Sequence, residues 1–583
     1  MKVIKYITIL SLIASLILCI IAAKTTYNAI KNDTTSSAET KTIHLDEPPV
    51  SIPSETAVSN EEKYAMIPIK EENVQSVVAE IAITDDINPD ENTQQLNWFE
   101  IGTQPTSNIQ FQKQAHENEE VFTNAQIFPY KYTDLEGVLA FRGGPFRDSP
   151  SWGYSTINDR TLEVKWQYTT PFTSSWGGGG GWTGQAVVVK WPDEIKNIMN
   201  LYPECKDKKD FVEVIFASLN GNIYFIDLAT GEPSRDPIKI GNPFKGSISL
   251  DPRGYPLLYA GDGIADTKNF GFRLYSLIDS SMLLFQNGRD SFAYRTWGAF
   301  DSSAIFNPET DTLFVCGENG LFYKILLNTE FDLENASIQI NPIFEKYRYK
   351  IAGNSYQGIE KSPVFYNHYA FFADNGGWIQ AIDLNNLEPM WTFNNTDDTD
   401  ATITLSIEDD TPYLYSGNEV DHQGTKGISH LRKINGLDGS LVWEKNYECL
   451  SLLSPKPING GLLATSVIGK KNLNDSVIFT LARYKGMHKG LMVALSKETG
   501  EELWQLPMGN YAWSSPVDFY DSDGNGYLIQ CNSAGDMLLI DGLTGQVFDT
   551  INLESNIESS PVIYNDWIVV ATRGGKLYCV EIK

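Results

Sequence analysis

Short apolar stretches alternate with turn residues along residues 161–583. One pattern recurs, in which a strand ends at a small residue, a turn with glycine follows, and a second apolar strand begins; it occurs at residues 217–227, 316–323, 373–383, 531–541 and 571–578. Asn and Gly tolerate the positive φ of a tight hairpin, and the residues after each turn are spaced as in a buried strand. Each copy therefore predicts a β-hairpin.

A second element precedes the hairpins and marks the start of a strand. Clear copies are Lys361-Ser-Pro-Val, Ser514-Ser-Pro-Val and Ser559-Ser-Pro-Val, with weaker copies near Thr183, Gly246, Ser302, Thr402 and Ser454. Proline is tolerated at the first residue of a strand. Counting these copies gives eight units of about 45 to 60 residues, the size of a four-stranded propeller blade. Seven units stay open, because the second, third and fifth copies are eroded.

A third element follows some hairpins and ends in tryptophan. Ala381, Asp383 and Trp391 fit the pattern Ala-x-Asp-x-x-Thr-Gly-x-x-x-Trp, Trp504 ends a second copy, and Gly439 with Trp443 keeps its second half. The pattern resembles the tryptophan-docking repeat of the PQQ-binding-like, or quinoprotein-like, β-propellers. The resemblance implies an all-β propeller over 161–583, with Trp166, Trp391, Trp443 and Trp504 as structural residues between blades. It is specific for fold and unspecific for function.

The ends of the repeat region predict how the ring closes. The last unit stops at Lys583 just after its third strand, and residues 162–168 form a spare strand that carries Trp166. We expect this strand to complete the last blade, which removes an open sheet edge.

The region before the repeats divides into three parts. Residues 1–23 place Lys2 and Lys5 before an apolar run of 17 residues, which favours a membrane signal-anchor over a cleaved signal peptide. Both interpretations place the rest of the chain outside the cytoplasm. Residues 24–127 are polar and predict a disordered linker. Residues 128–160 have no counterpart in the repeats and are expected to pack on the propeller.

The net charge of the chain limits the classes of partner that it is expected to bind. A formal charge of −29 and a pI near 4.6 argue against nucleic acid, because a backbone binder needs clustered Lys and Arg. The expected partners are the membrane, through the N-terminal helix, and a protein or a cell-envelope polymer.

The resemblance also raises an enzyme hypothesis. Quinoprotein dehydrogenases hold PQQ with a metal ion, and their alcohol dehydrogenases stack the quinone between a tryptophan and a disulfide of adjacent cysteines. No two of the six cysteines here are adjacent; they are Cys19, Cys205, Cys316, Cys449, Cys531 and Cys579. No matching set of calcium ligands can be placed either. We therefore expect no cofactor, and PQQ least of all.

One loop has the composition of a calcium site. Asp521, Asp523 and Asn525 place oxygen ligands at alternate positions with glycine at the bend, which suits a hard cation. The later acidic ligand is missing, and a plain turn between two strands explains the same residues. Calcium thus remains an open hypothesis at this loop.

Tryptophans near the strand starts are candidate ligand contacts. Trp176 and Trp182 flank five consecutive glycines, and Trp297 and Trp513 precede other strand starts. These four side chains could line one mouth of the central channel, where backbone and aromatic faces approach a ligand. Packing within the fold is the competing interpretation for each of them.

Three functions follow from these features. A binding or scaffolding module, anchored to the membrane and facing away from the cytoplasm, agrees with most of them. A quinone-dependent dehydrogenase and a calcium-dependent adhesion or wall-binding protein are the alternatives.

Overall fold

The computed structural model describes residues 99–101, 108–115, 124–173, 175–181, 184–454 and 458–583. All of them belong to one compact unit, and the predicted anchor 1–23, most of the linker and Trp182 lie outside the described residues. Helices are short: α3 is Asp193–Ile198, α4 is Pro203–Lys206, and two 3₁₀ turns are η4, Gly424–Lys426, and η5, Lys471–Leu473. No helix within these described ranges is long and apolar enough to cross a membrane.

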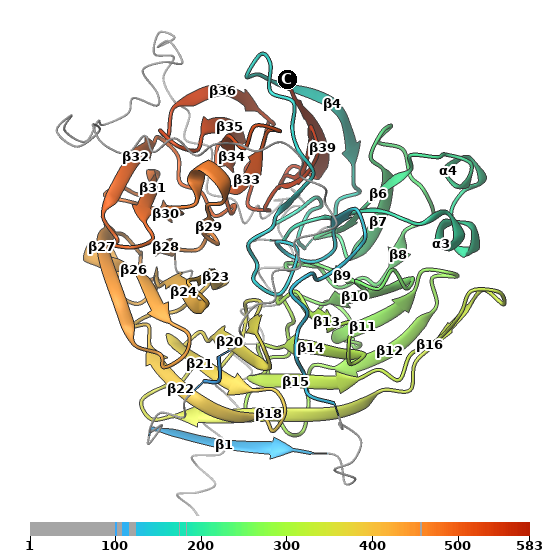
Figure 1. Ribbon diagram of the computed structural model, residues 1–583, viewed down its shortest axis with the longest axis horizontal. Helices are drawn as coiled ribbons and strands as arrows, with labels where there is room; N and C mark the ends of the chain where they lie inside the picture. The colour runs from blue at the N-terminus through green and yellow to red at the C-terminus, as the bar shows by residue number, and fades with distance from the viewer. Residues whose placement is uncertain (1–98, 102–107, 116–123, 174, 182–183, 455–457) are drawn as a thin grey trace, which may run out of the picture. The chain divides into compact units, whose positions relative to one another are not determined.

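The strands form an eight-bladed propeller, so the prediction of an all-β propeller with eight blades is confirmed (Figure 1). Each blade is an antiparallel sheet with its first strand innermost. Blade 1 contains β5 (Val187–Lys190), β6 (Val212–Ala217), β7 (Asn222–Asp227) and β8 (Ile238–Lys239), and blade 2 contains β9 (Ser249–Leu250), β10 (Leu257–Gly261), β11 (Gly271–Ser276) and β12 (Met282–Asn287). Blade 3 contains β13 (Ile305–Asn307), β14 (Thr312–Cys316), β15 (Leu321–Leu326) and β18 (Ile343–Ile351), and blade 4 contains β19 (Val364–Tyr366), β20 (Tyr369–Ala373), β21 (Trp378–Asp383) and β22 (Glu388–Asn394).

Blades 5 to 8 follow the same order. Blade 5 contains β23 (Thr404–Glu408), β24 (Thr411–Gly417), β26 (Gly427–Asn435) and β27 (Leu441–Cys449), and blade 6 contains β29 (Val467–Ile468), β30 (Ser476–Ala482), β31 (Gly490–Ser496) and β32 (Glu502–Met508). Blade 7 contains β33 (Val517–Tyr520), β34 (Gly526–Cys531), β35 (Asp536–Asp541) and β36 (Val547–Asn552), and blade 8 contains β37 (Val562–Tyr564), β38 (Trp567–Ala571), β39 (Lys576–Ile582) and β4 (Leu162–Thr169). The weak copy of the strand start near Ser454 is wrong, because a longer connection places the sixth start at Thr465.

The core is divided among the interfaces between blades. Each of the eight hydrophobic clusters in the described residues lies between two successive blades, as with Val188 and Val569 between blades 1 and 8. Middle strands are apolar on both faces because each blade has a neighbour on either side. Outermost strands such as β22 alternate between buried and exposed residues.

The ring is closed as the sequence predicts. β4 pairs antiparallel with β39, with Leu162 opposite Ile582 and Thr169 opposite Lys576. The N-terminal strand therefore forms the outer edge of the last blade, and the predicted closure is confirmed. β4 thereby covers the edge of β39 and ties the N-terminal side of the ring to the last blade.

The docking tryptophans join one blade to the next. Trp391 is 1% exposed, and its Nε1 donates to Gly436 O of the following blade at 2.9 Å. A Cβ on Gly439 would lie 2.7 Å from the Trp391 ring, so glycine is required for this contact. Trp166, Trp443 and Trp504 make the equivalent bond to Leu228 O, Lys497 O and Gly542 O. All four indoles therefore bond to the backbone of a neighbouring blade.

The strand starts are linked to each other by hydroxyl groups around the channel. Backbone N–H groups donate to the side chain of the corresponding residue in the next blade, as from Ser303 to Ser362, from Ser362 to Thr402, and from Ser515 to Ser560. Gln185 to Ser247 and Thr465 to Ser515 are further members. The recurring serine therefore satisfies buried backbone donors of a neighbouring blade.

Residues 137–155, called here the cross-channel segment, coil inside the ring and contact all eight blades (Figure 1). β2 (Gly137–Val138) pairs with β5, and β3 (Ser151–Trp152) pairs in parallel with β37. The other six blades are reached by these bonds: Leu250 N to Leu139 O, Phe141 N to Ser303 Oγ, Phe365 N to Pro145 O, Leu405 N to Phe146 O, Lys470 Nζ to Asp148 O and Ser155 N to Tyr520 O. These bonds hold the cross-channel segment against the inner strands of the ring.

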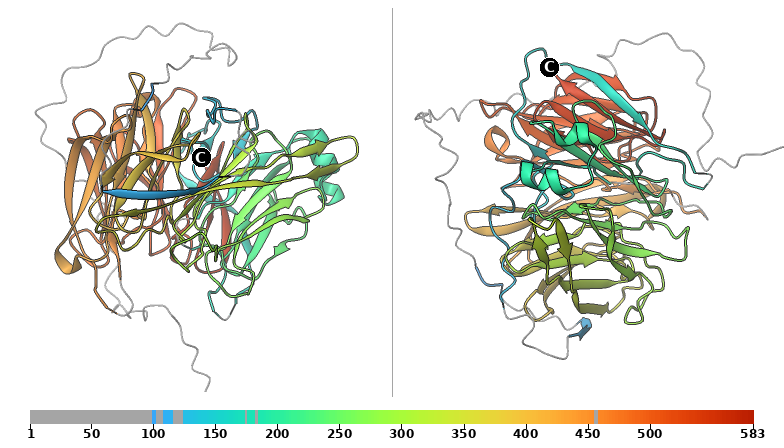
Figure 2. Two further views of the ribbon diagram at one scale, coloured as in Figure 1. Left: turned by 90° about the horizontal axis from the view of Figure 1, so that it is seen from below. Right: turned by 90° about the vertical axis from the view of Figure 1, so that its right-hand side faces the viewer.

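A few elements extend the blades. β1 (Ile109–Gln114) adds a fifth strand outside β18, and the hairpin of β16 (Glu330–Asp332) and β17 (Ser337–Gln339) projects from blade 3 (Figure 2). β25 (Glu419–Val420) pairs with β28 (Gly460–Gly461) beside blade 6. This last pair positions one of the carboxyl groups described below.

Candidate functional site

The candidate site is the central channel on the side where the inner strands begin. Each connection between blades ends two residues before the hydroxyl-linked start, and this position holds Lys245, Asp301, Glu360 and Asp400 in blades 2 to 5. Four consecutive blades therefore direct charged residues to the same level of the channel. Phe141 of the cross-channel segment lines a cavity together with Asp301 and Lys361.

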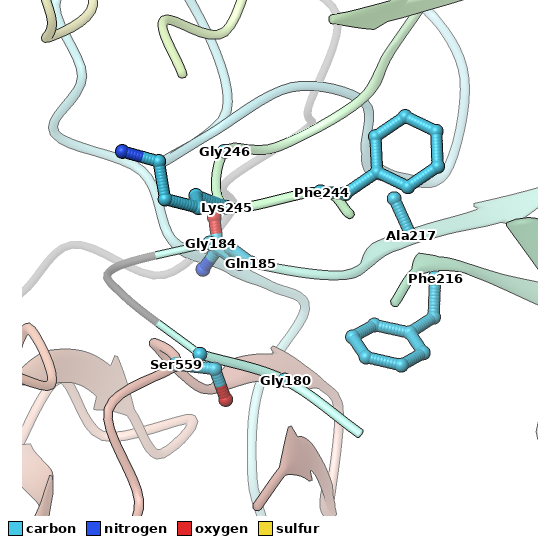
Figure 3. A pocket seen from close by; sticks show the side chains of 10 residues that line it. Gly180, Gly184, Gln185, Phe216, Ala217, Phe244, Lys245, Gly246 and Ser559 are labelled. Atoms are coloured by element: carbon cyan, nitrogen blue, oxygen red, sulfur yellow. The ribbon is translucent and has the colours of Figure 1, made fainter. Parts of the chain in front are cut away.

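Lys245 is the centre of the first charged group. Its Nζ forms an ion pair with Asp301 and lies 3.7 Å from Glu318 Oε1 and 3.8 Å from Glu360 Oε1. Glu318 comes from the turn between β14 and β15 of blade 3. Figure 3 shows the Lys245 side chain directed away from Phe244 and Phe216, which line the wall behind it. One lysine thus faces three carboxyl groups.

Lys361 extends the charged group toward blade 5. Its Nζ lies 3.2 Å from Glu360 Oε1 and 4.0 Å from Asp400 Oδ1. Asn375 Nδ2 donates to Glu360 Oε2 at 3.1 Å, so Glu360 has the most partners of these carboxylates. Asp400 Oδ1 is buried without a hydrogen-bond partner among the described residues.

Three further carboxyl groups continue this acidic wall. Oxygen atoms of Asp398, Glu419 and Asp421 lie within 4.8 Å of one another. With Asp301, Glu318, Glu360 and Asp400 they give seven carboxyl groups to the two ammonium groups of Lys245 and Lys361. We call these nine residues the channel acid cluster.

Burial and the excess of carboxyl groups over ammonium groups shift the pKa values of several carboxyl groups in the cluster. Burial, with the neighbouring Glu360, raises the pKa of Glu318 to about 8 and that of Asp400 to about 7. Burial raises the pKa of Asp301 to about 6, although Lys245 opposes it. Burial also acts on Glu360, but Lys361 and Lys245 outweigh it and lower its pKa to about 2. The cluster therefore binds protons near neutral pH unless another cation is present.

Two exposed aromatic residues precede members of the cluster in the chain. Trp297 and Tyr356 are 42% and 53% exposed and stand four residues before Asp301 and Glu360. The Tyr356 ring lies 5.8 Å from the ring of His422, whose Nδ1 is 2.9 Å from Asp421 Oδ2. We call Trp297, Tyr356 and His422 the aromatic rim.

Two of the tryptophans proposed from the sequence as ligand contacts pack against other rings, and the role of all four in ligand binding stays a prediction. Trp297 packs against Phe270 at 5.4 Å and Trp513 against Tyr511 at 5.9 Å, and no ring contact joins these two or Trp176 in the described part of the chain. The glycines after Trp176 have a packing role. A Cβ on Gly179 would lie 2.0 Å from Thr572 O, so this loop fits closely against blade 8.

The loop proposed for calcium is a self-contained turn. Asp521 Oδ1 accepts from the backbone N–H groups of Asp523 and Asn525 at 3.0 and 2.8 Å, and Oδ2 accepts from Asn525 Nδ2 at 2.9 Å. These bonds are those of an Asx turn. Asp523 and Asn525 are exposed, and the calcium hypothesis at this loop stays a prediction.

The channel residues do not fit a quinone cofactor. All five cysteines of the described residues are free and buried, and none is adjacent to another. PQQ is a polycarboxylate, whereas the channel has an excess of carboxyl groups and both of its lysines are already paired. The two cavities beside the cluster have a volume of about 10 Å³ each, the space of one water molecule.

Comparisons with known proteins agree with the fold and reach no further. No family model matches the chain. A quinohemoprotein alcohol dehydrogenase from Comamonas testosteroni has a TM-score of 0.53 at 10% identity, over 77% of this chain and 80% of that one. The chain therefore has the quinoprotein-like propeller fold. BamB from Moraxella catarrhalis has a TM-score of 0.43 at 13% identity, over 72% of this chain and 98% of that one.

One curated relative shares a short stretch of sequence. The beta-alanine-activating enzyme of Danio rerio is 30% identical over 99 residues, which are 17% of this chain and 9% of that protein. The chain thus matches less than a tenth of that relative's length, and the match identifies no function here.

The acid cluster was not predicted from the sequence, although the sequence contains a signal for part of it. Aligning the strand starts on their hydroxyl residues places Lys245, Asp301, Glu360 and Asp400 in one column. Glu419 and Asp421 follow no repeat position, because they belong to the long connection between β24 and β26. Only the structure brings them to the channel.

Proposed function

We propose that the chain is a membrane-anchored binding propeller on the extracytoplasmic side of a membrane. Its acid cluster and aromatic rim would hold the basic side chains of a protein partner at the mouth of the central channel. The observation that carries this proposal is the excess of buried carboxyl groups in the channel, several with oxygens that lack a partner in the described residues.

The rim supports a cationic ligand in a second way. Tyr and Trp faces attract Lys and Arg side chains by cation–π contact, and both residues are frequent at the centre of protein interfaces. Trp297 and Tyr356 are exposed, and the Tyr356 ring contacts His422, which is paired with Asp421, so one basic side chain could contact a ring and a carboxylate together.

The N-terminal sequence supports the location. Residues 1–23 have the charge and apolar length of a signal-anchor, and a polar linker separates them from the propeller. Mass analysis of the mature protein from membranes tests this part. A soluble product beginning near Lys24 or Thr25 would contradict the anchor and favour a cleaved signal peptide.

Binding is tested with the detergent-solubilised full chain and a fluorescent lysine- and arginine-rich peptide. Anisotropy is measured at low and high salt. We expect binding that weakens with salt and that falls about tenfold in Trp297→Ala and Tyr356→Ala. Tyr154→Ala is the matched control, because Tyr154 is 58% exposed and lies near Tyr520, where the inner strand of blade 7 ends.

Two results would count against the proposal. Equal loss of binding in Tyr154→Ala would mean that the peptide binds the acidic surface without using the channel mouth. Stoichiometric quinone absorbance after addition of PQQ and calcium, or dye reduction that needs both quinone and substrate, would favour the dehydrogenase alternative instead.

A further inference from the structure

Three members of the acid cluster form a compact group at the junction of blades 5 and 6. Asp398 lies in the connection between β22 and β23, Glu419 lies in β25, and Asp421 follows β25 directly. One oxygen atom from each lies within 4.8 Å of the other two. The three residues therefore bring carboxylate oxygens together from two separate segments of the chain.

Two oxygens of this group are buried and lack partners. Glu419 is fully buried; its Oε1 accepts from Asn459 Nδ2 at 2.9 Å, while its Oε2 has no hydrogen-bond partner among the described residues. Asp398 Oδ1 is also buried without a hydrogen-bond partner among the described residues. An ionised carboxylate in such a place costs several kcal/mol unless a charge or a donor compensates it. A missing partner of positive charge accounts for both atoms.

The carboxyl groups are held in position by the backbone around them. Glu419 N donates to Asp398 O at 2.9 Å, which joins the two segments. Asp397 Oδ2 accepts from Asp421 N at 3.2 Å and from Gln423 Nε2 at 2.9 Å, which fixes the turn that carries Asp421. Asp397 therefore acts as a positioning residue, as the outer partners of metal ligands do.

We propose that Asp398, Glu419 and Asp421 form a calcium-binding site. Carboxylate oxygens are the ligands of hard cations, and water would complete the coordination. Calcium accepts six to eight oxygens at about 2.3 to 2.6 Å in a flexible arrangement, whereas magnesium demands a near-octahedral shell at about 2.0 to 2.1 Å, so a group of three carboxylates from two separate segments suits calcium better. The site requires no quinone. It also goes beyond the proposed function, because it does not depend on whether a basic partner binds.

The site is tested on the full chain, stripped with EDTA and titrated with CaCl₂ alone. Calorimetry should show about one equivalent of calcium, and the melting temperature should rise, because the ion binds the folded state preferentially. Glu419→Gln and Asp398→Asn should each lower the affinity at least tenfold. Both keep the shape of the side chain and remove a buried charge, so in EDTA they should melt no lower than the unaltered chain.

Asp523→Ala, in the exposed loop, is the matched control and should keep the full response to calcium. No heat and no rise in melting temperature in the unaltered chain would overturn the site. A rise that vanishes in Asp523→Ala and persists in Glu419→Gln would assign calcium to the loop. An equal rise with MgCl₂ would overturn the assignment to calcium. Peptide binding is measured separately, so failure of either proposal is recognised independently.

Discussion

The cross-channel segment and the acid cluster accommodate buried charge in opposite ways. In the cross-channel segment, Arg142 and Arg147 are fully buried, and every guanidinium nitrogen donates to a backbone carbonyl. In the acid cluster, Glu419 and Asp398 have buried oxygens without a partner. The first arrangement stabilises the ring, since all its polar groups are satisfied. The second indicates a bound proton or cation.

The largest effect on stability is expected when a buried arginine of the cross-channel segment is replaced. Arg142→Met leaves Pro516 O and Ser466 O, the carbonyls of two neighbouring blades, without their donor. We expect the free energy of unfolding to fall by roughly 3–5 kcal/mol, measured by urea denaturation. Arg289→Met, at an exposed position, should change it by less than about 0.5 kcal/mol. Equal effects of the two would mean that the segment contributes little to closing the ring.

A second test concerns the blade interfaces, which surround the channel. Gly439 has φ +71°, and a Cβ there would lie 2.7 Å from the Trp391 ring. Gly439→Ala should therefore destabilise the chain by about 2–3 kcal/mol, from backbone strain and overpacking. Gly509 has open space around its Cα, and Gly509→Ala should be close to neutral in the same thermal melts. A neutral Gly439→Ala would contradict the docking role of Trp391.

The pH dependence of stability distinguishes Glu318 from Glu360. The pKa of Glu318 rises from an ordinary 4.5 to about 8, because burial and Glu360 disfavour its charged form. Its contribution to stability is therefore present below pH 4.5 and is lost as the pH rises through about 8. Glu318→Gln should remove about 1–2 kcal/mol of the fall in stability between pH 5 and 9. Melting temperatures across this range in EDTA measure it.

Glu360→Gln provides the matched control for this test. The pKa of Glu360 is lowered to about 2, since Lys361 and Lys245 outweigh burial, so its contribution is present above pH 4.5 and is lost only toward pH 2. Glu360→Gln should lower stability across pH 5 to 9, and because it also removes a charge that raises the pKa of Glu318, it should reduce the slope less than Glu318→Gln does. If both variants change the slope alike, the division of charge in the cluster is wrong.

Repetition explains how much of the structure could be predicted from sequence. Strand starts, hairpins and docking tryptophans recur, so the ring, the number of blades and the pairing of β4 with β39 followed from counting copies. The cross-channel segment occurs once, and its path depends on carbonyls contributed by Ser466 and Pro516, far away in the chain. Part of the site could not be predicted for a related reason, because Glu419 and Asp421 lie in a connection that has no counterpart in the other blades and reach the channel only through the fold.

The smallest effect is expected at the loop that has the composition of a calcium site. Asp523 is exposed and contributes its backbone N–H to Asp521 Oδ1 at 3.0 Å, a bond that Asp523→Ala leaves intact. In EDTA this variant should unfold within about 0.5 kcal/mol of the unaltered chain. Asp521→Ala should cost about 1 kcal/mol, because it removes the acceptor of the Asx turn. Urea denaturation measures both, and a loss above about 1 kcal/mol in Asp523→Ala would show that its carboxylate supports the fold, so that the loop is more than a turn.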